Sequence, residues 1–124
     1  MSGRTILYVE DNEMNRKIVR ALLKNTKYQL LEAFDGEAGV AAALEHKPDL
    51  ILMDVQLPKM SGIDATRRIR ADAATSATPI LVITSFALSG DEQKAMEAGA
   101  TGYLAKPYSP MDLLGRIRKL LPET

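Results

Sequence analysis

The chain of 124 residues contains no cysteine and only one histidine. The missing cysteines exclude disulfide bonds, thiolate catalysis and iron–sulfur or zinc sites built on sulfur, and one histidine offers few ways to hold a transition metal. We therefore expect any bound metal ion to have oxygen ligands.

The sequence also lacks an excess of charge of one sign. Sixteen Lys and Arg residues balance sixteen Asp and Glu residues, so the formal net charge at pH 7 is zero. A neutral chain has no overall field that would draw it to nucleic acid or anionic lipid. No apolar run approaches the roughly 18 residues of a membrane span, and no signal peptide is recognisable. We expect a cytoplasmic protein with no direct contact to nucleic acid or membrane.

The composition that is present is typical of a folded domain. Hydrophobic residues make up 46% of the chain and charged residues 26%, a balance unlike that of disordered proteins. The length suits one compact domain, and no linker, repeat or low-complexity tract divides it. We expect residues 1–124 to form a single domain.

Five short, mostly apolar runs end abruptly in polar residues and predict β-strands. Three of them are nearly continuous in apolar residues, which is typical of a parallel sheet covered on both faces. The predicted strands are residues 5–9, 29–33, 49–53, 79–83 and 101–105.

Stretches of helical period separate these strands. Apolar residues at helical spacing predict one stripe in the first helix and another in the last. The stripes are Met14, Ile18, Ala21 and Leu22, and Met111, Leu114, Ile117 and Leu121 with Leu113 and Leu120 beside them.

Helix-starting signals support this division. Asp35-Gly36 and Ser61-Gly62 are expected to open the second and third helices, and Ser109-Pro110 the last. Ser89-Gly-Asp-Glu92 matches a capping box for the fourth helix, which Gly99 would close.

Alternating strands and helices predict an α/β fold, a three-layer αβα sandwich with right-handed crossovers. A five-stranded doubly wound parallel sheet commonly takes the order 2-1-3-4-5, whose switch point lies between the first and third strands. Ligands of such sheets bind outside the carboxyl ends of the strands at that point. The residues that follow Val9 and Met53 are therefore the candidates for a functional site.

Three acidic residues occupy these positions: Glu10 and Asp11 after the first strand, and Asp54 after the third. Carboxylates about 5 Å apart, at an effective dielectric constant near 20, repel by roughly 3 kcal/mol per pair. This repulsion destabilises the fold unless a cation enters, and Mg²⁺ suits two carboxylates, a carbonyl and several waters. Each acid alone could cap a helix or open a loop, but three at adjacent strand ends favour a metal site.

Thr84 and Lys106 follow the fourth and fifth strands and place a hydroxyl and an ammonium at the same crevice. Together with the acids and a metal ion they would surround a phosphoryl group, to which the protein supplies position and charge neutralisation. Asp54, at the centre, is the natural nucleophile. Taken singly, Thr84 would more often just end a strand and Lys106 would more often face solvent.

Four blocks of sequence, in this order, resemble the receiver domain of two-component response regulators, and the resemblance runs from Thr5 to Leu121. The blocks are VEDN (residues 9–12), LMDVQLPKMSG (52–62), TSFA (84–87) and AGATGYLAKP (98–107). Among receivers, the chain looks most similar to single-domain regulators of the DivK type and to receivers of hybrid histidine kinases. The resemblance implies the flavodoxin-like receiver fold.

The resemblance also implies a role for each residue of the site. Asp54 would accept a phosphoryl group from the phosphohistidine of a sensor histidine kinase or a histidine phosphotransfer protein. Asp11 and Asp54 would bind Mg²⁺ directly, together with the backbone carbonyl of Gln56, and Glu10 would act through water. Lys106 would hold a phosphoryl oxygen.

The implied consequence is a signalling switch rather than an enzyme, one that catalyses only its own phosphorylation and slow dephosphorylation. Thr84 would move toward the phosphoryl group, and Tyr103 would turn into the space it leaves. Gln56 and Phe86 would control how water reaches the acyl phosphate. Phe86 would shield this group, so we expect slow dephosphorylation. The shift in populations would change the affinity of the face made by the fourth helix, fifth strand and fifth helix for a downstream protein. The chain would be a monomer or a phosphorylation-dependent dimer.

Other interpretations remain open. The chain could be a receiver excised from a hybrid histidine kinase or a longer regulator, although its Met1 start favours a stand-alone form whose partner is another protein. A phosphatase that forms an aspartyl phosphate usually has a second Asp where this chain has Gln56. A nucleotide-binding flavodoxin-like protein would need a phosphate loop that is missing after the first strand. A scaffold independent of phosphorylation would not need the full set of acids, hydroxyl and lysine.

The remaining charged residues favour solvent-exposed roles. His46 suits the C-terminal end of a helix, where its charge would favour the helix dipole. Two basic clusters are expected on solvated faces, and either could instead contact a partner: Arg67, Arg68 and Arg70, and Arg116, Arg118 and Lys119.

Overall fold

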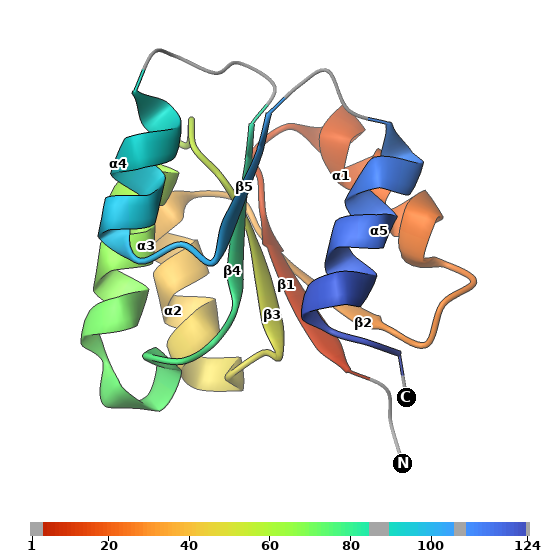
Figure 1. The fold of residues 1–124 in the computed structure, drawn as a ribbon, viewed down its shortest axis with the longest axis horizontal. Coiled ribbons are helices and arrows are strands. Elements are labelled where there is room, and N and C mark those ends of the chain that lie inside the picture. The colour runs from red at the N-terminus through yellow and green to blue at the C-terminus, as the bar shows by residue number, and fades with distance from the viewer. Residues whose placement is uncertain (1–3, 85–89, 106–108, 124) are drawn as a thin grey trace.

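The computed structural model describes residues 4–84, 90–105 and 109–123 (Figure 1). In them, strands and helices alternate along the chain. The strands are β1 (Thr5–Val9), β2 (Gln29–Ala33), β3 (Leu50–Asp54), β4 (Ile80–Thr84) and β5 (Gly102–Ala105). The helices are α1 (Glu13–Leu23), α2 (Gly36–His46), α3 (Gly62–Ala71), α4 (Asp91–Ala98) and α5 (Pro110–Leu120), with a 3-10 turn η1 (Ala73–Thr75) after α3. None of the helices described is long and apolar enough to cross a membrane.

The strands form one parallel sheet in the order β2-β1-β3-β4-β5, which confirms the predicted topology. Figure 1 shows α2, α3 and α4 on one face of the sheet and α1 and α5 on the other, so the predicted three-layer sandwich is also confirmed. The central pair, β1 and β3, places Val9 beside Met53. The residues that follow these two positions therefore meet at one edge of the sheet.

The core lies on both faces of the sheet, because successive side chains of a strand point to opposite sides. In β1, Leu7 and Val9 pack with α2, α3 and α4, whereas Ile6 and Tyr8 pack with α1 and α5. Every residue of β3 and β4 is buried. Burial on both sides explains why these two strands are continuous in apolar residues rather than alternating.

The third and fourth strands end one residue later than the sequence predicts. Asp54 pairs with Ile83, and Thr84 pairs with Ala105, so both polar residues still belong to the sheet. Apolarity alone places the boundary before a polar residue, whereas the backbone ladder does not depend on side-chain polarity. Asp54 and Thr84 are thus positioned by the rigid sheet rather than by a loop.

The predicted apolar stripe of α1 is wrong at Met14, Ile18 and Ala21, which are exposed, whereas Leu22 is partly buried against the core. Met14 and Ile18 are 64% and 45% exposed, and the residues that α1 buries are Arg16, Val19 and Leu23. Hydrophobic periodicity assigns an arginine to solvent, but Arg16 is turned inward because it donates to the carbonyl of Glu10. The spacing of apolar residues along the sequence cannot predict this contact, because it joins a charged side chain to a backbone carbonyl.

The stripe predicted for α5 is confirmed except at its start. Leu113, Leu114, Ile117 and Leu121 are buried. The core covers only the later turns of this helix, so Met111, in the first turn, is 66% exposed.

Side-chain caps open three of the helices as predicted. Asp35 accepts from the amide of Ala38 at 2.7 Å at the start of α2, and Ser61 caps α3. Ser109 caps α5 and forms a capping box with Asp112. Such caps satisfy amide groups that have no partner inside the helix.

The fourth helix starts differently from the prediction. Its N-cap position falls on Gly90, at φ 86°, and among the described residues no side chain caps it. The predicted cap residue, Ser89, lies outside the described residues. Gly99, at φ 110°, closes the helix as predicted, because glycine adopts the left-handed conformation without strain.

Arg70 is half-buried, which contradicts the prediction of a solvated cluster at this position. Its Nε donates to the carbonyl of Gly99 at 2.8 Å, and its Nη1 donates to the carbonyl of Thr75 at 3.1 Å. The distribution of charged residues along the sequence does not show that the carbonyls of Gly99 and Thr75 will lie beside this arginine. Arg70 thus connects the end of α3 to the end of α4.

Candidate functional site

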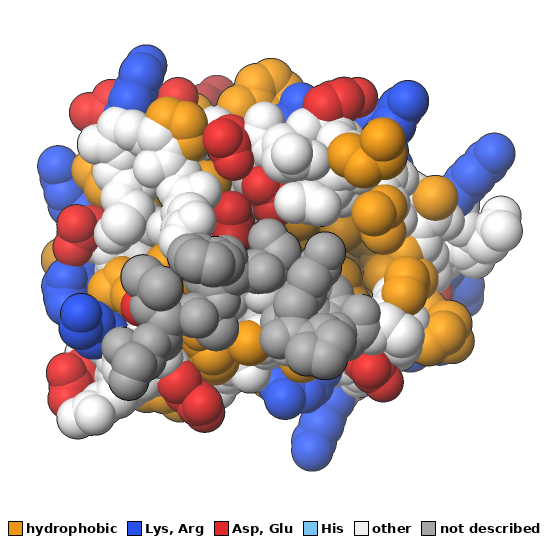
Figure 2. All heavy atoms as spheres, turned by 90° about the horizontal axis from the view of Figure 1, so that it is seen from above, with side chains coloured by type: hydrophobic (Ala, Val, Ile, Leu, Met, Phe, Trp, Pro, Cys, Tyr) orange, Lys and Arg blue, Asp and Glu red, His pale blue; other side chains and the backbone are white. Residues whose placement is uncertain are grey.

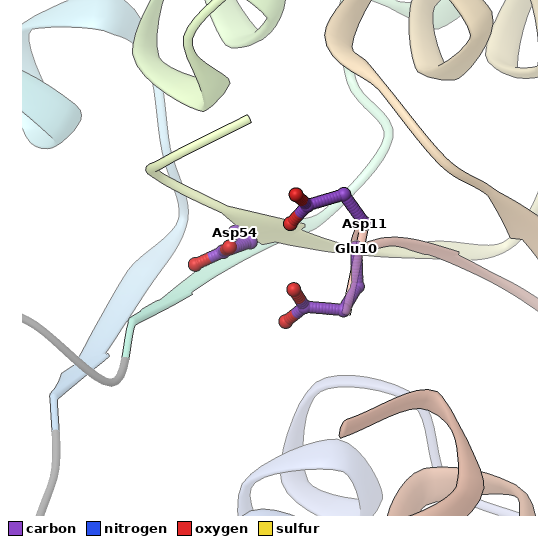
Figure 3. Close-up of side chains that lie close together, drawn as sticks. All are labelled: Glu10, Asp11 and Asp54. Carbon is purple, nitrogen blue, oxygen red and sulfur yellow. The ribbon is translucent and has the colours of Figure 1, made fainter. Parts of the chain in front are cut away.

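The carboxylates of Glu10, Asp11 and Asp54 converge at the switch point of the sheet. Each offers one oxygen atom, and these oxygens lie within 4.8 Å of one another. Figure 3 shows Glu10 and Asp11, just past β1, with their carboxylates turned toward Asp54 at the end of β3. Glu10 and Asp54 are only 4% and 8% exposed, whereas Asp11 is exposed. The three acids that the sequence places after two strands therefore form one cluster.

The cluster lines a polar cavity of about 250 Å³. Figure 2 looks onto this end of the molecule, where acidic side chains gather between the two helical layers. The described residues that line the cavity are Glu10, Asp11, Asn12, Asn15, Asp54, Gln56 and Thr84. None of these described residues is cationic, so within the lining the negative charges are not balanced.

Polar groups from β1 and from the start of α1 hold the side chain of Glu10. Its Oε1 accepts from the hydroxyl of Tyr8 at 3.1 Å and from Nδ2 of Asn15 at 3.3 Å. Its Oε2 accepts from the backbone amide of Asn12 at 3.2 Å. Burial nevertheless raises the pKa of Glu10 above its usual range, because these hydrogen bonds only partly compensate for lost water.

Asn12 and Asn15 are site residues for which the sequence assigned no role. Asn12 also accepts the amide of Asn15 as the N-cap of α1. The spacing of the two asparagines after the acids is the only sequence signal that could have indicated them, since residues three apart share one face of a helix.

Asp54 carries the strongest electrostatic perturbation of the site. Burial, and then the neighbouring carboxylate of Glu10, raises the pKa of Asp54 to about 8, although the amide of Val55 donates to its Oδ1 at 2.9 Å. Asp11 adds a smaller effect in the same direction. Without a cation, this carboxyl group therefore retains a proton at neutral pH.

The donor set fits a hard divalent cation such as Mg²⁺. All candidate ligands are oxygen atoms, and their spacing allows one ion to contact more than one carboxylate. Burial first, and then the neighbouring carboxylate of Glu10, raises the pKa of Asp54, and a buried carboxylate beside a second one is stabilised by either a proton or a cation. Gln56 lines the cavity, next to the carboxylates that an ion would contact.

A glycine lets the chain after Asp54 fold back on the strand. The amide of Gly62 donates to the carbonyl of Val55 at 2.8 Å. A Cβ atom at Gly62 would lie 1.8 Å from the carbonyl oxygen of Asp54, a distance that no side chain can occupy. Gly62 therefore permits the close return that holds the segment around Gln56 beside the cavity.

Thr84 and Tyr103 lie on the neighbouring strands β4 and β5. Thr84 is 2% exposed and lines the cavity. Tyr103 pairs with Val82, two residues before Thr84, and its hydroxyl is buried without a hydrogen-bond partner among the residues described. Burial raises the pKa of Tyr103, as do the nearby charges of Asp91 and Glu92. An unsatisfied buried hydroxyl is costly and favours a side chain with a second position.

Lys106 and Phe86, which the sequence singles out beside these residues, lie outside the described residues. Gln56 is exposed and lines the cavity. The structure thus brings together Glu10, Asp11, Asp54, Gln56 and Thr84, and it adds Asn12 and Asn15.

The strand order and the acidic cavity place the chain among doubly wound α/β proteins with a ligand site at the switch point. Its sequence matches the response regulator receiver domain over residues 6–118. The chain therefore belongs to the response regulator receiver family, whose members are signalling switches rather than classic enzymes.

Individual relatives agree with this assignment. The polar-differentiation response regulator DivK of Brucella anthropi is 36% identical over 118 residues, which cover 95% of this chain and 96% of the relative. The receiver domain of sensor histidine kinase PA1611 from Pseudomonas aeruginosa, solved with a magnesium ion coordinated in its active site cleft, is 37% identical with a TM-score of 0.87 over 96% of this chain and 98% of that one. The chemotaxis response regulator CheY4 of Vibrio cholerae is 31% identical, with a TM-score of 0.87 over 95% of this chain and 98% of that one.

Proposed function

We propose that residues 1–124 form a single receiver domain that acts as a phosphorelay response regulator in the cytoplasm. Asp54 accepts a phosphoryl group, in a Mg²⁺-dependent reaction, from a sensor histidine kinase or a histidine phosphotransfer protein. The observation that carries the proposal is the convergence of Glu10, Asp11 and Asp54 within 4.8 Å at the switch point of the sheet.

Asp11 and Asp54 would hold the ion, with the carbonyl of Gln56 and, through water, Glu10. When bound, Mg²⁺ neutralises the carboxylates and the charge of the phosphoryl oxygens. The amide of Val55 donates to Oδ1 of Asp54 at 2.9 Å, which fixes the rotation of the carboxylate and leaves Oδ2 for attack. A bond forms between Oδ2 and phosphorus as the bond from phosphorus to the histidine nitrogen breaks. Lys106 binds a phosphoryl oxygen of the product.

Thr84 and Tyr103 would couple phosphorylation of Asp54 to a conformational change at the protein surface. Thr84 lines the cavity and supplies a hydroxyl to the phosphoryl group, while Tyr103 turns toward the space that Thr84 leaves. The buried hydroxyl of Tyr103 has no hydrogen-bond partner within the described part of the chain, which supports two positions of this ring. The face formed by α4, β5 and α5 then changes its affinity for a downstream protein, as a population shift between two states. The protein acts as a monomer or a phosphorylation-dependent dimer.

The similarity to the receiver of a sensor histidine kinase, at 37% identity, supports a second candidate, in which this receiver works within a hybrid kinase or a longer regulator. The chemistry at Asp54 is the same in both. A phosphatase is disfavoured because Gln56, two residues after Asp54, has no acidic group to protonate a leaving oxygen.

The proposal is tested by intact-mass analysis after incubation with acetyl phosphate and Mg²⁺. The wild-type protein should gain one phosphoryl group that hydroxylamine removes, and Asp54→Asn should gain none. Asp64→Asn, which changes an exposed acid on α3, is the matched control and should be phosphorylated like wild type. Full phosphorylation of Asp54→Asn, or none of the wild type, would overturn the proposal.

A further inference from the structure

Arg16 is a buried cation that lies behind the acidic cavity, on the first turn of α1. Its side chain is 9% exposed, and it is not among the residues that line the cavity. We propose that Arg16 is a positioning residue of the metal site, which fixes the turn at Glu10 and Asp11. This inference rests on the proposed function, since it concerns how that site holds its ion.

The decisive contact is with the backbone. Nη1 of Arg16 donates to the carbonyl oxygen of Glu10 at 2.9 Å, and the contact is buried. The amide of Glu10 donates to the carbonyl of Ala33 at 2.9 Å, just past the last residue of β1. The carbonyl of Glu10 belongs to the same planar peptide group as the amide of Asp11. Arg16 therefore orients the peptide group from which Asp11 projects its carboxylate.

The guanidinium group is itself held in place. It contacts Oε1 of Glu13 at 2.6 Å through Nη2 and Oε1 of Glu32 at 3.3 Å through Nε. The ring of Phe34 covers it, with 4.1 Å between the guanidinium carbon and the ring centroid. A buried planar group in contact with these three side chains loses little freedom when it binds a carbonyl. Arg16 is thus preorganised to hold Glu10.

The rest of the same turn holds the side chain of Glu10. Asn15 and the amide of Asn12 donate to its carboxylate, while Arg16 holds its backbone. The start of α1 therefore holds both the side chain and the backbone of Glu10. It also brings a positive charge close to a cluster of three carboxylates without occupying the cavity.

Arg20 provides a natural comparison. It contacts the same two acids as Arg16, Glu13 at 3.3 Å and Glu32 at 2.7 Å. Its side chain is 41% exposed, and the hydrogen bonds described for it end at these two acids. A variant at Arg20 disturbs the same ion-pair network but spares the carbonyl of Glu10.

The test is a calorimetric titration of the purified protein with MgCl₂, for wild type, Arg16→Met, Arg16→Lys, Arg20→Met and Asp54→Asn. Loss of groups that support metal ligands typically weakens metal affinity by about 10- to 100-fold. We expect Arg16→Met to weaken Mg²⁺ binding roughly 10-fold or more and Arg20→Met to leave the affinity close to that of wild type. Arg16→Lys keeps the charge but not the planar group, so we expect it to restore only part of the affinity.

A merely structural role gives a different result. Such a role lowers the free energy of unfolding equally in EDTA and in Mg²⁺ and leaves the Mg²⁺ affinity unchanged, because only ligand binding to the folded state adds stability. Unchanged affinity in Arg16→Met, or full wild-type affinity in Arg16→Lys, would overturn the inference. If Arg16→Met does not fold, Phe34→Leu, which removes the aromatic cover, takes its place and should weaken binding to a smaller extent. A wild-type protein that binds no Mg²⁺ would instead refute the proposed function itself.

Discussion

Val9 and Met53 are register partners in the neighbouring parallel strands β1 and β3. Because parallel strands keep the same direction, the residues that follow this pair leave the sheet at the same edge. Glu10 and Asp11 therefore meet Asp54 in a cavity that buries two of the three carboxylates.

The crowding of the carboxylates predicts that Asp54→Asn stabilises the metal-free protein. In EDTA at pH 9, above the pKa of about 8 of Asp54, we expect a gain of about 1 to 3 kcal/mol in the free energy of unfolding. At pH 6 the gain should be smaller, because Asp54, with a pKa of about 8, already carries a proton. Urea unfolding at the two pH values checks this, and equal or lower stability of the variant at pH 9 would contradict it.

The raised pKa of Asp54 also predicts a dependence of stability on pH. The pKa rises from an ordinary 3.8 to about 8 on folding, so between these values the folded state binds more protons than the unfolded state. In EDTA, the contribution of Asp54 is present in full below about pH 4 and is lost as the pH rises through about 8. Urea unfolding from pH 5 to 9 should show stability falling, and Asp54→Asn should flatten that slope.

Binding of Mg²⁺ should show the opposite trend. The ion competes with the proton on Asp54, so its affinity for the wild type should increase with pH and level off above about 8. Calorimetric titrations at several pH values measure this trend. An affinity that does not change between pH 6 and 8 would show that Asp54 is already ionised in the metal-free protein.

The buried face of α1 predicts opposite outcomes at adjacent positions. Val19 is 2% exposed and Ile18 is 45% exposed. We expect Val19→Ala to cost about 2 kcal/mol and Ile18→Ala to change stability by less than about 0.5 kcal/mol. Urea unfolding in Mg²⁺ measures both, and a larger cost at Ile18 would mean that the apolar stripe, rather than the Arg16 face, is buried.

Alanine substitutions at two glycines test whether the chain must pass close to the backbone of Asp54. A Cβ at Gly62 would lie 1.8 Å from the carbonyl oxygen of Asp54, whereas a Cβ at Gly115 in α5 would meet nothing within 4 Å. We expect Gly62→Ala to destabilise by about 2 kcal/mol or more and to weaken Mg²⁺ binding. Gly115→Ala should stabilise by about 0.5 to 1 kcal/mol. Thermal and urea unfolding of the pair separates a local clash from a general effect of alanine.

The polar residues expected to meet at the site show where sequence reasoning succeeds. Glu10, Asp11, Asp54 and Thr84 were singled out because each stands at the end of a strand, and the structure brings all four to one cavity. Asn15 was missed because a side chain that reaches back from a helix to an acid gives no apolar signal. Its contact with Glu10 depends on the direction in which α1 leaves the sheet.

Arg16 and Arg70 show more clearly what sequence patterns fail to predict. Arg70 donates to carbonyls of Gly99 and Thr75, and Arg16 donates to the carbonyl of Glu10. Sequence patterns assign such residues to solvent, because charge is costly to bury without a partner. The partners are backbone carbonyls. Every residue has one, so the sequence does not show which carbonyl will lie within hydrogen-bond distance of an arginine in the folded chain.

The alternation of strands and helices and the acids at the strand ends follow from the sequence alone, since periodicity and local chemistry are properties of neighbouring residues. The strand order is the one that five-stranded doubly wound sheets commonly take, and the observed strand pairing confirms it. Which face of α1 turns inward, where α4 begins and which side chains hold Glu10 were decided by the tertiary structure. The contacts of Glu10 join residues at most six apart in sequence, but they depend on the direction in which α1 leaves the sheet, and the free energy of satisfying buried polar groups there outweighs the local apolar pattern.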